Sequence, residues 1–201
     1  MKRMADPAVK RDQHYTYADY RSWPEDERWE LIDGVAWNMC AAPTSHHQSL
    51  LQELGRQIGN LLEGHNCRVF PAPFDVLLPE TADESWDATD TVLQPDLTVI
   101  CDRPKIREHG CVGAPDLVIE ILSPSTMSKD LSVKRERFAR AGVTECWFVS
   151  PGDESILVFV LDDNGHYPAV PQVHNRTATL RSSAVPAIQL ELSGIFSRAR
   201  L

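Results

Sequence analysis

A single carboxylate inside an apolar stretch is the feature of this sequence with the clearest chemical consequence. Glu120 interrupts the run LVIEIL (117–122), and a strand that is apolar on both sides is usually covered on both faces. Burying an ionised carboxylate is costly unless a cation, a metal ion or hydrogen-bond donors compensate it. Glu120 is therefore either a strand-end carboxylate that reaches water or an arginine, or a metal ligand or catalytic acid.

Asp96 is the acid best placed to share a cation with Glu120. It opens a second apolar stretch, DLTVIC (96–101), and neighbouring strands lie ~4.8 Å apart, so the two carboxylates can meet across a strand pair. Asp116 precedes Glu120 on the same strand, and ~3.3 Å per residue separates the two by roughly 13 Å, too far to hold one ion. We therefore expect Asp116 to be a strand-entry residue.

These carboxylates suit a hard divalent cation. Mg²⁺ is commonly held by one or two carboxylates and keeps several waters, and such an ion activates water and neutralises charge on phosphorus. Lys134 belongs to the next expected helix and could direct its ammonium group at the same phosphate oxygens. The alternative for Lys134 is a solvated lysine in a basic surface stretch.

Two further polar features leave alternatives open. His46 and His47 are adjacent, so on a helix they point roughly 100° apart and do not form a chelating pair. They are a polar first turn or, for His47, a contact to Glu30 or to phosphate. Asp75 alternates with apolar neighbours in FDVLL (74–78) and either lines the same cleft or is a structural hydrogen-bond acceptor.

The hydrophobic pattern predicts the elements that would position these residues. Asp33-Gly34 between WELI and VAWNM is typical of a tight β-hairpin, and apolar residues from Thr44 to Gly64 repeat on one helical face. We expect further strands at 67–70, 74–79, 96–101, 116–122, 145–150 and 155–161, helices at 16–23, 126–141 and the C-terminus, one or two weak strands after 162, and a surface loop at 80–91. The strand–helix–strand unit 116–150 favours a parallel pair. The expected fold class is α/β (α+β), with a mixed central β-sheet flanked by helices.

Length and composition are those of an ordinary globular protein. The 201 residues are 42% hydrophobic and 24% charged, which fits a flexible N-terminal segment at 1–14 and a single domain at 15–201. No apolar run approaches the ~20 residues of a membrane span, and the polar start has no secretion signal, so we expect no membrane partner and a cytoplasmic location. The five scattered cysteines form no CxxC pair and are expected to be reduced.

The charge distribution limits the partners. A net charge of −9 argues against a general nucleic-acid coat protein, whose domain pI usually exceeds ~9. The charges are segregated, however: residues 75–102 contain eight acids and no Lys or Arg, whereas residues 129–140 contain five basic residues and two acids. A local basic groove therefore remains compatible with the sequence.

Six segments in a fixed order resemble a known family. They are WELIDG (29–34), SHHQ (45–48), FPAPFDVLL (70–78), QPDL (94–97), GAPDLVIEILSPST (113–126) and KRERFARAGVTECWFVSP (134–151). The set covers roughly residues 15–165, and EILSPST followed by ARAGV is its most specific part. On these segments the chain resembles the Uma-two family of restriction endonuclease-like proteins, in the PD-(D/E)XK nuclease superfamily.

The resemblance implies a restriction endonuclease-like core with a Mg²⁺-dependent phosphodiesterase site, in which Mn²⁺ can substitute for Mg²⁺. By position, Asp96 and Glu120 would be the metal carboxylates, and the carbonyl of Ile121 would complete the ligand set. Glu30 matches the upstream acid of the family, and Lys134 matches its lysine.

The residue two positions after Glu120 departs from the superfamily motif. Leu122 stands where the motif has lysine. The resembled family shares this departure, and its lysine is taken to have moved to the next helix, which gives Lys134 here. The departure and the net charge of −9 motivate a second hypothesis, a catalytically weak or inactive nuclease-fold protein that acts as a binding module. A third is metal-dependent hydrolysis of a smaller phosphate ester.

The main hypothesis from the sequence is a Mg²⁺-dependent endonuclease that hydrolyses phosphodiester bonds in DNA. Asp96 and Glu120 would hold the ion, water activated by the ion would attack phosphorus, and Lys134 would orient that water or stabilise developing charge. The expected partner is nucleic acid, and a homodimer is plausible because cutting both strands of a duplex suits a two-fold pair.

Overall fold

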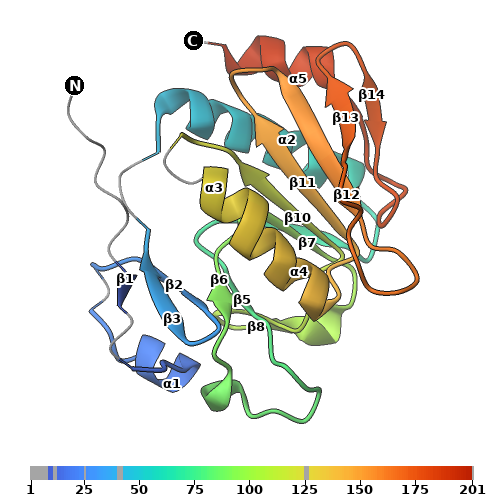
Figure 1. Ribbon diagram of the computed structural model, residues 1–201. Helices are drawn as coiled ribbons and strands as arrows, with labels where there is room; N and C mark the ends of the chain where they lie inside the picture. The colour runs from blue at the N-terminus through green and yellow to red at the C-terminus, as the bar shows by residue number, and fades with distance from the viewer. Residues whose placement is uncertain (1–8, 11–12, 25, 40–42, 125–126, 201) are drawn as a thin grey trace, which may run out of the picture.

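The computed structural model describes residues 9–10, 13–24, 26–39, 43–124 and 127–200. In these residues the chain forms two larger β-sheets, a two-stranded sheet and a few helices (Figure 1). The larger sheets both contain parallel and antiparallel pairs, which confirms the expected mixed α+β class. No helix in the described part of the chain is long and apolar enough to cross a membrane.

The strands vary from two to six residues in length. They are β1 (Val9–Lys10), β2 (Trp29–Ile32), β3 (Val35–Asn38), β4 (Arg68–Pro71), β5 (Asp75–Leu77), β6 (Val92–Leu93), β7 (Leu97–Ile100), β8 (Ile106–Arg107), β9 (Gly110–Val112), β10 (Leu117–Ile121), β11 (Glu145–Ser150), β12 (Ser155–Val160), β13 (Gln172–Asn175), β14 (Thr179–Arg181) and β15 (Gln189–Glu191). The α-helices are α1 (Tyr17–Tyr20), α2 (Ser45–Leu61), α3 (Met127–Lys129), α4 (Arg135–Ala141) and α5 (Leu192–Ala199). Two short 3₁₀ helices are η1 (Trp86–Ala88) and η2 (Arg103–Lys105), and η3 (Asp130–Lys134) is a π-helix.

The six-stranded sheet lies at the centre of the fold. Its strand order is β13-β12-β11-β10-β7-β4, with β10 parallel to β11 and the other neighbouring pairs antiparallel. The chain leaves β10, passes through α3, η3 and α4, and returns as β11. The expected strand–helix–strand unit and its parallel pair are therefore confirmed.

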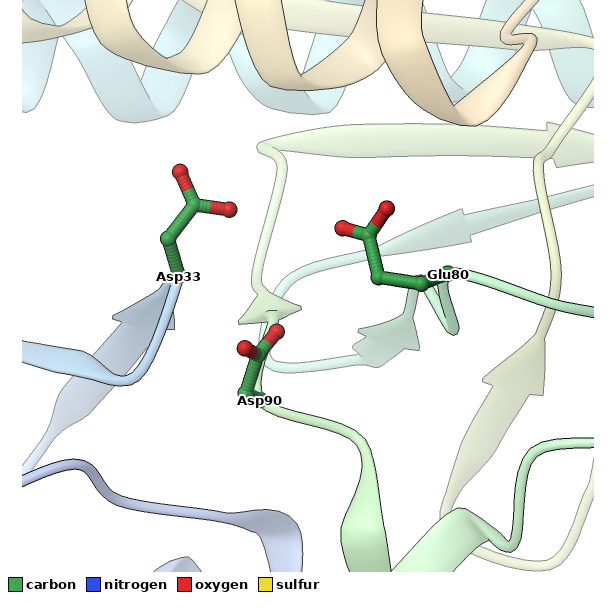
Figure 2. A group of neighbouring side chains, drawn as sticks. All are labelled: Asp33, Glu80 and Asp90. Carbon is green, nitrogen blue, oxygen red and sulfur yellow. The ribbon is translucent and has the colours of Figure 1, made fainter.

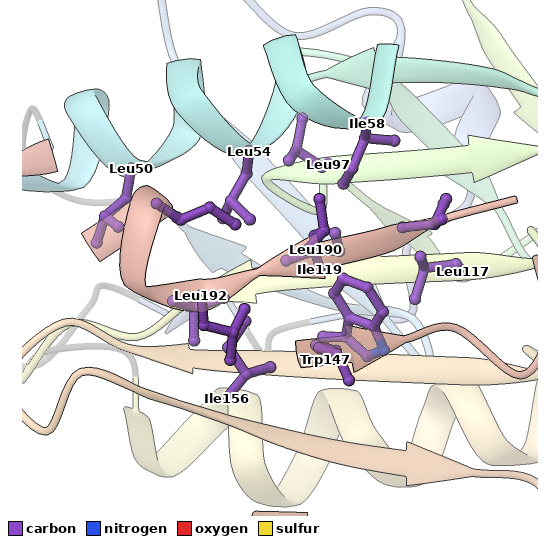
Figure 3. Packing of buried hydrophobic residues seen from close by; sticks show 14 of the residues in the cluster. Leu50, Leu54, Ile58, Leu97, Leu117, Ile119, Trp147, Ile156, Leu190 and Leu192 are labelled. Carbon is purple, nitrogen blue, oxygen red and sulfur yellow. The ribbon is translucent and has the colours of Figure 1, made fainter. Parts of the chain in front are cut away.

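Helices α2 and α5 cover one face of this sheet. Thr44 begins α2 by accepting a hydrogen bond of 3.2 Å from the backbone N–H of His47, as an N-cap residue does. Leu50, Leu54 and Ile58, spaced four residues apart on α2, then face the sheet and are fully buried (Figure 3). They belong to one cluster with Leu97, Leu117, Ile119 and Trp147 of the sheet. This packing fixes the position of the α2 N-terminus relative to β7 and β10.

The opposite face of the sheet is covered by η3 and α4. Phe138 of α4 is buried in one cluster with Val118 and Leu122. Because side chains alternate along a strand, Glu120 shares this face with Val118 and Leu122. β10 therefore presents Glu120 to η3, which ends at Lys134.

The seven-stranded sheet positions Glu30. Its strand order is β1-β3-β2-β6-β5-β9-β8. The turn residues Asp33 and Gly34 of the β2–β3 hairpin have φ of 50° and 72°, the left-handed conformation that a two-residue turn between twisted strands requires. The predicted hairpin is confirmed, and Glu30 in β2 is completely buried.

Several short elements differ from the expectation. β6, β8 and β9 have only two or three residues, too few for a hydrophobic period to show. The expected loop at 80–91 contains η1 and ends in the core, since Arg137 Nε donates to buried Thr91 Oγ1 at 3.0 Å. After residue 162 there are three strands, because β14 and β15 are held by pairing with each other. Residues 9–10, in the segment expected to be flexible, form β1 and pair with β3, and Thr126, an expected helix start, lies outside the described residues.

The prediction that the cysteines are reduced is wrong for one pair. Cys67 and Cys101 form a disulfide, because the antiparallel register of β4 and β7 continues by one pair to place them opposite each other. No spacing motif announces such a pair, since the two cysteines are 34 residues apart in the chain. Cys111 and Cys146 are free and buried as expected, and Cys40 lies outside the described residues.

Candidate functional site

Asp96 and Glu120 stand opposite one another on adjacent strands. Asp96 directly precedes β7, and the antiparallel register of β7 with β10 pairs Leu97 with Ile119. Extending that register by one residue places Asp96 opposite Glu120, where cross-strand neighbours share a face. Asp96 Oδ2 also accepts a hydrogen bond of 2.7 Å from the backbone N–H of Ile121. The strand that carries Glu120 is thus tied directly to Asp96.

Lys134 lies among carboxylates in the protein interior. Its Nζ is 2.8 Å from Glu120 Oε1, 2.8 Å from Glu30 Oε1 and 3.6 Å from Asp130 Oδ1. The side chain is only 4% exposed, so the alternative of a solvated surface lysine does not hold. Burial lowers the pKa of Lys134, but the three carboxylates outweigh burial and raise the pKa well above its usual value.

Glu30 pairs with two lysines at once. Its Oε1 contacts Lys134, and its Oε2 accepts a hydrogen bond of 2.7 Å from Lys129 Nζ. The backbone N–H of Gln94 also donates to Oε1 at 3.1 Å. Burial raises the pKa of Glu30, but Lys134 and Lys129 together outweigh it and bring the pKa down to about 2. Glu30 is therefore an ionised, fully buried carboxylate at neutral pH.

Glu120 has the opposite electrostatic character. Burial raises its pKa, Lys134 lowers it, and the nearby charges of Asp130, Asp96 and Glu30 raise it again, so the pKa lies well above the usual value. The same lysine acts on Glu30 and Glu120, but Glu30 has a second lysine, whereas Glu120 faces three other acids. Glu120 is only 4% exposed, and among the described residues its ion-pair partner is Lys134 rather than an arginine. A buried acid with a raised pKa beside a cation is a functional-site signal.

His47 brings the N-terminus of α2 into contact with this group. Its Nε2 is 3.2 Å from Asp96 Oδ2, and its side chain is 14% exposed. Burial lowers the pKa of His47, but hydrogen bonds with Asp96 and with the Ile121 backbone raise it above the usual value. A polar first turn alone does not describe His47, because its ring contacts a carboxylate of the site. That carboxylate is Asp96 and not Glu30.

A hydrogen-bonded network through Gln94 links Glu30 of β2 to Asp75 of β5 and Tyr20 of α1. Gln94 Nε2 donates to Asp75 Oδ1 at 2.8 Å and to the Tyr20 hydroxyl at 3.0 Å, and that hydroxyl donates to Asp75 at 3.1 Å. Burial raises the pKa of Asp75 and, with the charge of Asp75, raises the pKa of Tyr20. Asp75 is thus a structural acceptor, and Gln94 connects it to Glu30. Asp116, as expected, lies outside the group, where it accepts from the N–H of Cys101 at 2.7 Å.

The donor atoms at Asp96 and Glu120 fit a divalent cation. In the described part of the chain, no donor reaches Asp96 Oδ1 or Glu120 Oε2, so each acid has one oxygen without a hydrogen bond. With all four acids ionised and His47 neutral, Glu30, Asp96, Glu120 and Asp130 exceed the two lysines by two negative charges, equal to the charge of the ion. Two hard carboxylate oxygens and a backbone carbonyl are ligands that Mg²⁺ accepts.

A second acidic group contacts α4. Asp33, Glu80 and Asp90 have carboxylate oxygens within 4.8 Å of one another, and they are the one such group of three side chains among the described residues (Figure 2). Arginines already neutralise it: Arg137 lies 3.0 Å from Glu80, and Arg140 pairs with both Asp33 and Glu80. These contacts are those of an ion-pair network that anchors α4.

Known structures define the class of fold. A crystal structure described as "a putative nuclease belonging to DUF820", from Anabaena variabilis, superposes with a TM-score of 0.70 over 92% of this chain and 99% of that chain, at 19% sequence identity. Identity at this level shows that the two chains share a fold.

The family follows from the sequence comparison. The Uma2 model, described as "Putative restriction endonuclease", matches residues 17–193. The chain belongs to the Uma2 family, which confirms the resemblance seen in its motifs. A relative from Synechocystis, called "Uncharacterized protein slr1290", is 24% identical over 152 residues, which are 74% of this chain and 75% of the relative.

The structure adds residues that the sequence did not single out. In a regular α-helix Lys129 and Lys134 would lie on different sides, because residues five apart point roughly 140° apart. The π-helix η3 changes this periodicity, and both lysines meet at Glu30. Gln94 is part of the QPDL segment, but nothing in its type indicated a contact with Glu30.

Proposed function

We propose that this protein is a Mg²⁺-dependent endonuclease that hydrolyses phosphodiester bonds in DNA. The observation that carries the proposal is the pair Asp96 and Glu120, opposite one another on adjacent strands, each with one carboxylate oxygen that receives no hydrogen bond from the described residues. Membership of the Uma2 family and the nuclease-like fold support the same conclusion.

In this proposal Asp96, Glu120 and the carbonyl of Ile121 hold the ion. Mg²⁺ bound there would supply an activated water and would neutralise charge on the phosphate; Mn²⁺ is expected to substitute. Lys134 holds Glu120 and Glu30 in place through its two contacts of 2.8 Å. Glu30 keeps two ammonium groups beside the ion site, and such groups favour the negative charge that develops at phosphorus.

Plasmid nicking tests this function. We expect the wild-type protein to nick supercoiled DNA with Mg²⁺ or Mn²⁺ and to be inactive in EDTA. Asp96→Ala and Glu120→Ala should each lower the rate by a factor of at least about 10², typical for loss of a charged catalytic group. Asp163→Ala, at an exposed acid in the loop after β12, is the matched control. Activity that survives both site substitutions, or that needs no metal, would contradict the proposal.

The alternative is a nuclease-fold binding module with little or no catalysis. Two observations favour it. Leu122 stands where the superfamily motif has lysine, and it is buried in the core at 5% exposure. Lys134 already forms ion pairs with three acids of the protein. Calorimetric titration separates the two functions. A specific nucleic-acid or protein complex without divalent-ion binding and without cleavage would favour the module.

The partners follow from the proposed reaction. DNA is the expected ligand, and a homodimer would present two sites to the two strands of a duplex. Sedimentation of the protein with and without a short duplex measures both. The cytoplasmic location stays a prediction from the sequence.

A further inference from the structure

The histidine at the start of α2 occupies a position that the proposed reaction does not yet explain. His47 stands in the first turn of α2, and its backbone N–H is held by the Thr44 side chain. Its ring is directed at Asp96, with Nε2 3.2 Å from Oδ2. Three buried leucine and isoleucine side chains fix α2 on the sheet. The ring is therefore presented from a rigid element, as a positioning group requires.

The two ring nitrogens of His47 have different surroundings. Nε2 lies 3.2 Å from Asp96 Oδ2, and the oxygen of an ionised carboxylate can only accept a hydrogen bond. Nδ1 is buried and has no hydrogen-bond partner among the described residues. A carboxylate acceptor at Nε2 requires a proton there. Nε2–H is thus a donor to Asp96, whatever the state of Nδ1.

This donor gives one oxygen of Asp96 its second hydrogen-bond partner. Asp96 Oδ2 accepts from the N–H of Ile121 at 2.7 Å and faces His47 Nε2 at 3.2 Å. A carboxylate oxygen has about two lone-pair directions, so Oδ2 is saturated from two elements, β10 and α2. The carboxylate cannot rotate without losing both contacts, and Oδ1 is the oxygen that remains for another ligand.

We propose that His47 is a positioning residue that locks the Asp96 carboxylate, so that Oδ1 faces the divalent ion next to Glu120. The inference rests on the proposed function, because it assigns the ion to Asp96 and Glu120. His47 itself does not touch the ion, because its protonated Nε2 donates a hydrogen bond to Asp96 Oδ2 and is not available as a ligand. Partners of metal-binding carboxylates contribute typically 10–100-fold to metal affinity.

The test measures ion affinity rather than cleavage alone. Mn²⁺ is titrated into the full chain, and free Mn²⁺ is followed by electron paramagnetic resonance. We expect His47→Ala to weaken binding by about 10–100-fold and His47→Gln, whose amide can reach the position of Nε2, to restore most of it. His46→Ala is the matched control, because His46 lies in the same turn and its side chain has no hydrogen bond or ion pair with the described residues. The unfolding temperature without metal shows whether each variant folds.

Each outcome decides between defined conclusions. Equal affinity in wild type and His47→Ala overturns the positioning role while leaving the proposed function intact. Loss of affinity in both His47 variants, in step with a lowered unfolding temperature, shows that the histidine only stabilises the fold. Nitrogen modulation of the Mn²⁺ electron spin echo that disappears in His47→Ala shows that His47 is a direct ligand, which also overturns the inference. If the wild type binds no divalent ion, the proposed function fails, and the inference fails with it.

Discussion

Asp96 Oδ2 accepts a hydrogen bond of 2.7 Å from the backbone N–H of Ile121, the residue that follows Glu120. This contact continues the antiparallel pairing of β7 and β10 beyond its last regular pair, so a side chain takes the place of a ladder carbonyl. The separation of the two acids is consequently set by the backbone of the central sheet. A site built on strands in this way is positioned more precisely than one built on loops.

Asp96→Asn should separate charge from geometry at this contact. An amide oxygen can still accept from Ile121 N–H, so we expect the free energy of unfolding to change by less than about 1 kcal/mol. Removal of the negative charge should nevertheless lower divalent-ion affinity by at least about tenfold. Urea unfolding and ion titration of the same preparation measure both. A variant that binds the ion as well as the wild type would remove Asp96 from the ligand set.

The two lysines on Glu30 should respond differently to removal of their charge. Lys134→Met leaves three acids around a buried site without their shared cation, and breaking such a buried pair costs about 3–5 kcal/mol. Among the described residues Lys129 pairs with Glu30 alone, and its side chain is 11% exposed against 4% for Lys134, so Lys129→Met should cost less, about 1–2 kcal/mol. Chemical denaturation compares them. Equal destabilisation would show that the burial of Lys134 has no energetic role.

The depressed pKa of Glu30 predicts acid sensitivity of the fold. The pKa is about 2 in the folded chain against an ordinary value of 4.5, so the ionised form stabilises the fold. That contribution is complete above pH 4.5 and is lost as the pH falls towards 2. By linkage it amounts to about 3 kcal/mol. Glu30→Gln should therefore be destabilised at pH 7, with the gap to wild type closing below pH 4.5.

Urea unfolding between pH 3 and pH 8 checks this dependence, with Glu63→Gln at an exposed glutamate after α2 as the control. A gap between Glu30→Gln and wild type that stays constant with pH would contradict the electrostatic explanation, since packing differences do not titrate.

The pH dependence of stability that Glu120 contributes should be opposite to that of Glu30. Its pKa is raised in the folded chain, so the folded state holds the proton more tightly than the unfolded state does. Stability is then lost as the pH rises above the ordinary value of 4.5 towards the raised pKa. Glu120→Gln removes this cost and can still accept from Lys134, so we expect a gain of roughly 1 kcal/mol at pH 8, or about 2–4 °C in Tm. Differential scanning calorimetry without metal measures it, and a lower Tm would contradict the prediction.

Arg137 and Arg140 allow the stability contributions of a buried and an exposed arginine with the same ion-pair partners to be compared. Both contact Asp33 and Glu80, but the Arg137 side chain is 2% exposed and the Arg140 side chain 45%. Arg137 also donates to the carbonyl of Leu78. Arg137→Met removes the donor to the buried Thr91 hydroxyl and Leu78 carbonyl and should cost about 2–4 kcal/mol. Arg140→Met should cost at most about 1 kcal/mol. Thermal unfolding of the two variants gives the comparison directly.

Local sequence determined much of this fold. The periodicity of α2, the Asp33-Gly34 hairpin and the apolar strands β7, β10, β11 and β12 were all predictable, because each depends on residue types close together in the chain. The anomaly of Glu120 within β10 was equally visible, and adjacent-strand geometry led from it to Asp96. The short strands β6, β8 and β9 were not predictable, since two or three residues carry no period and are held by their partners.

The tertiary structure alone decided how the charges at the site are shared. The sequence contains Glu30, Lys129 and Lys134, but it does not say that a π-helix turns both lysines towards one carboxylate, 99 residues from Lys129. It likewise contains Cys67 and Cys101 without showing that strand register joins them. Contacts of this kind depend on which distant elements pack together, and burial then sets the pKa of each group. The chain thus specifies its acids and bases locally, whereas packing decides which of them are charged.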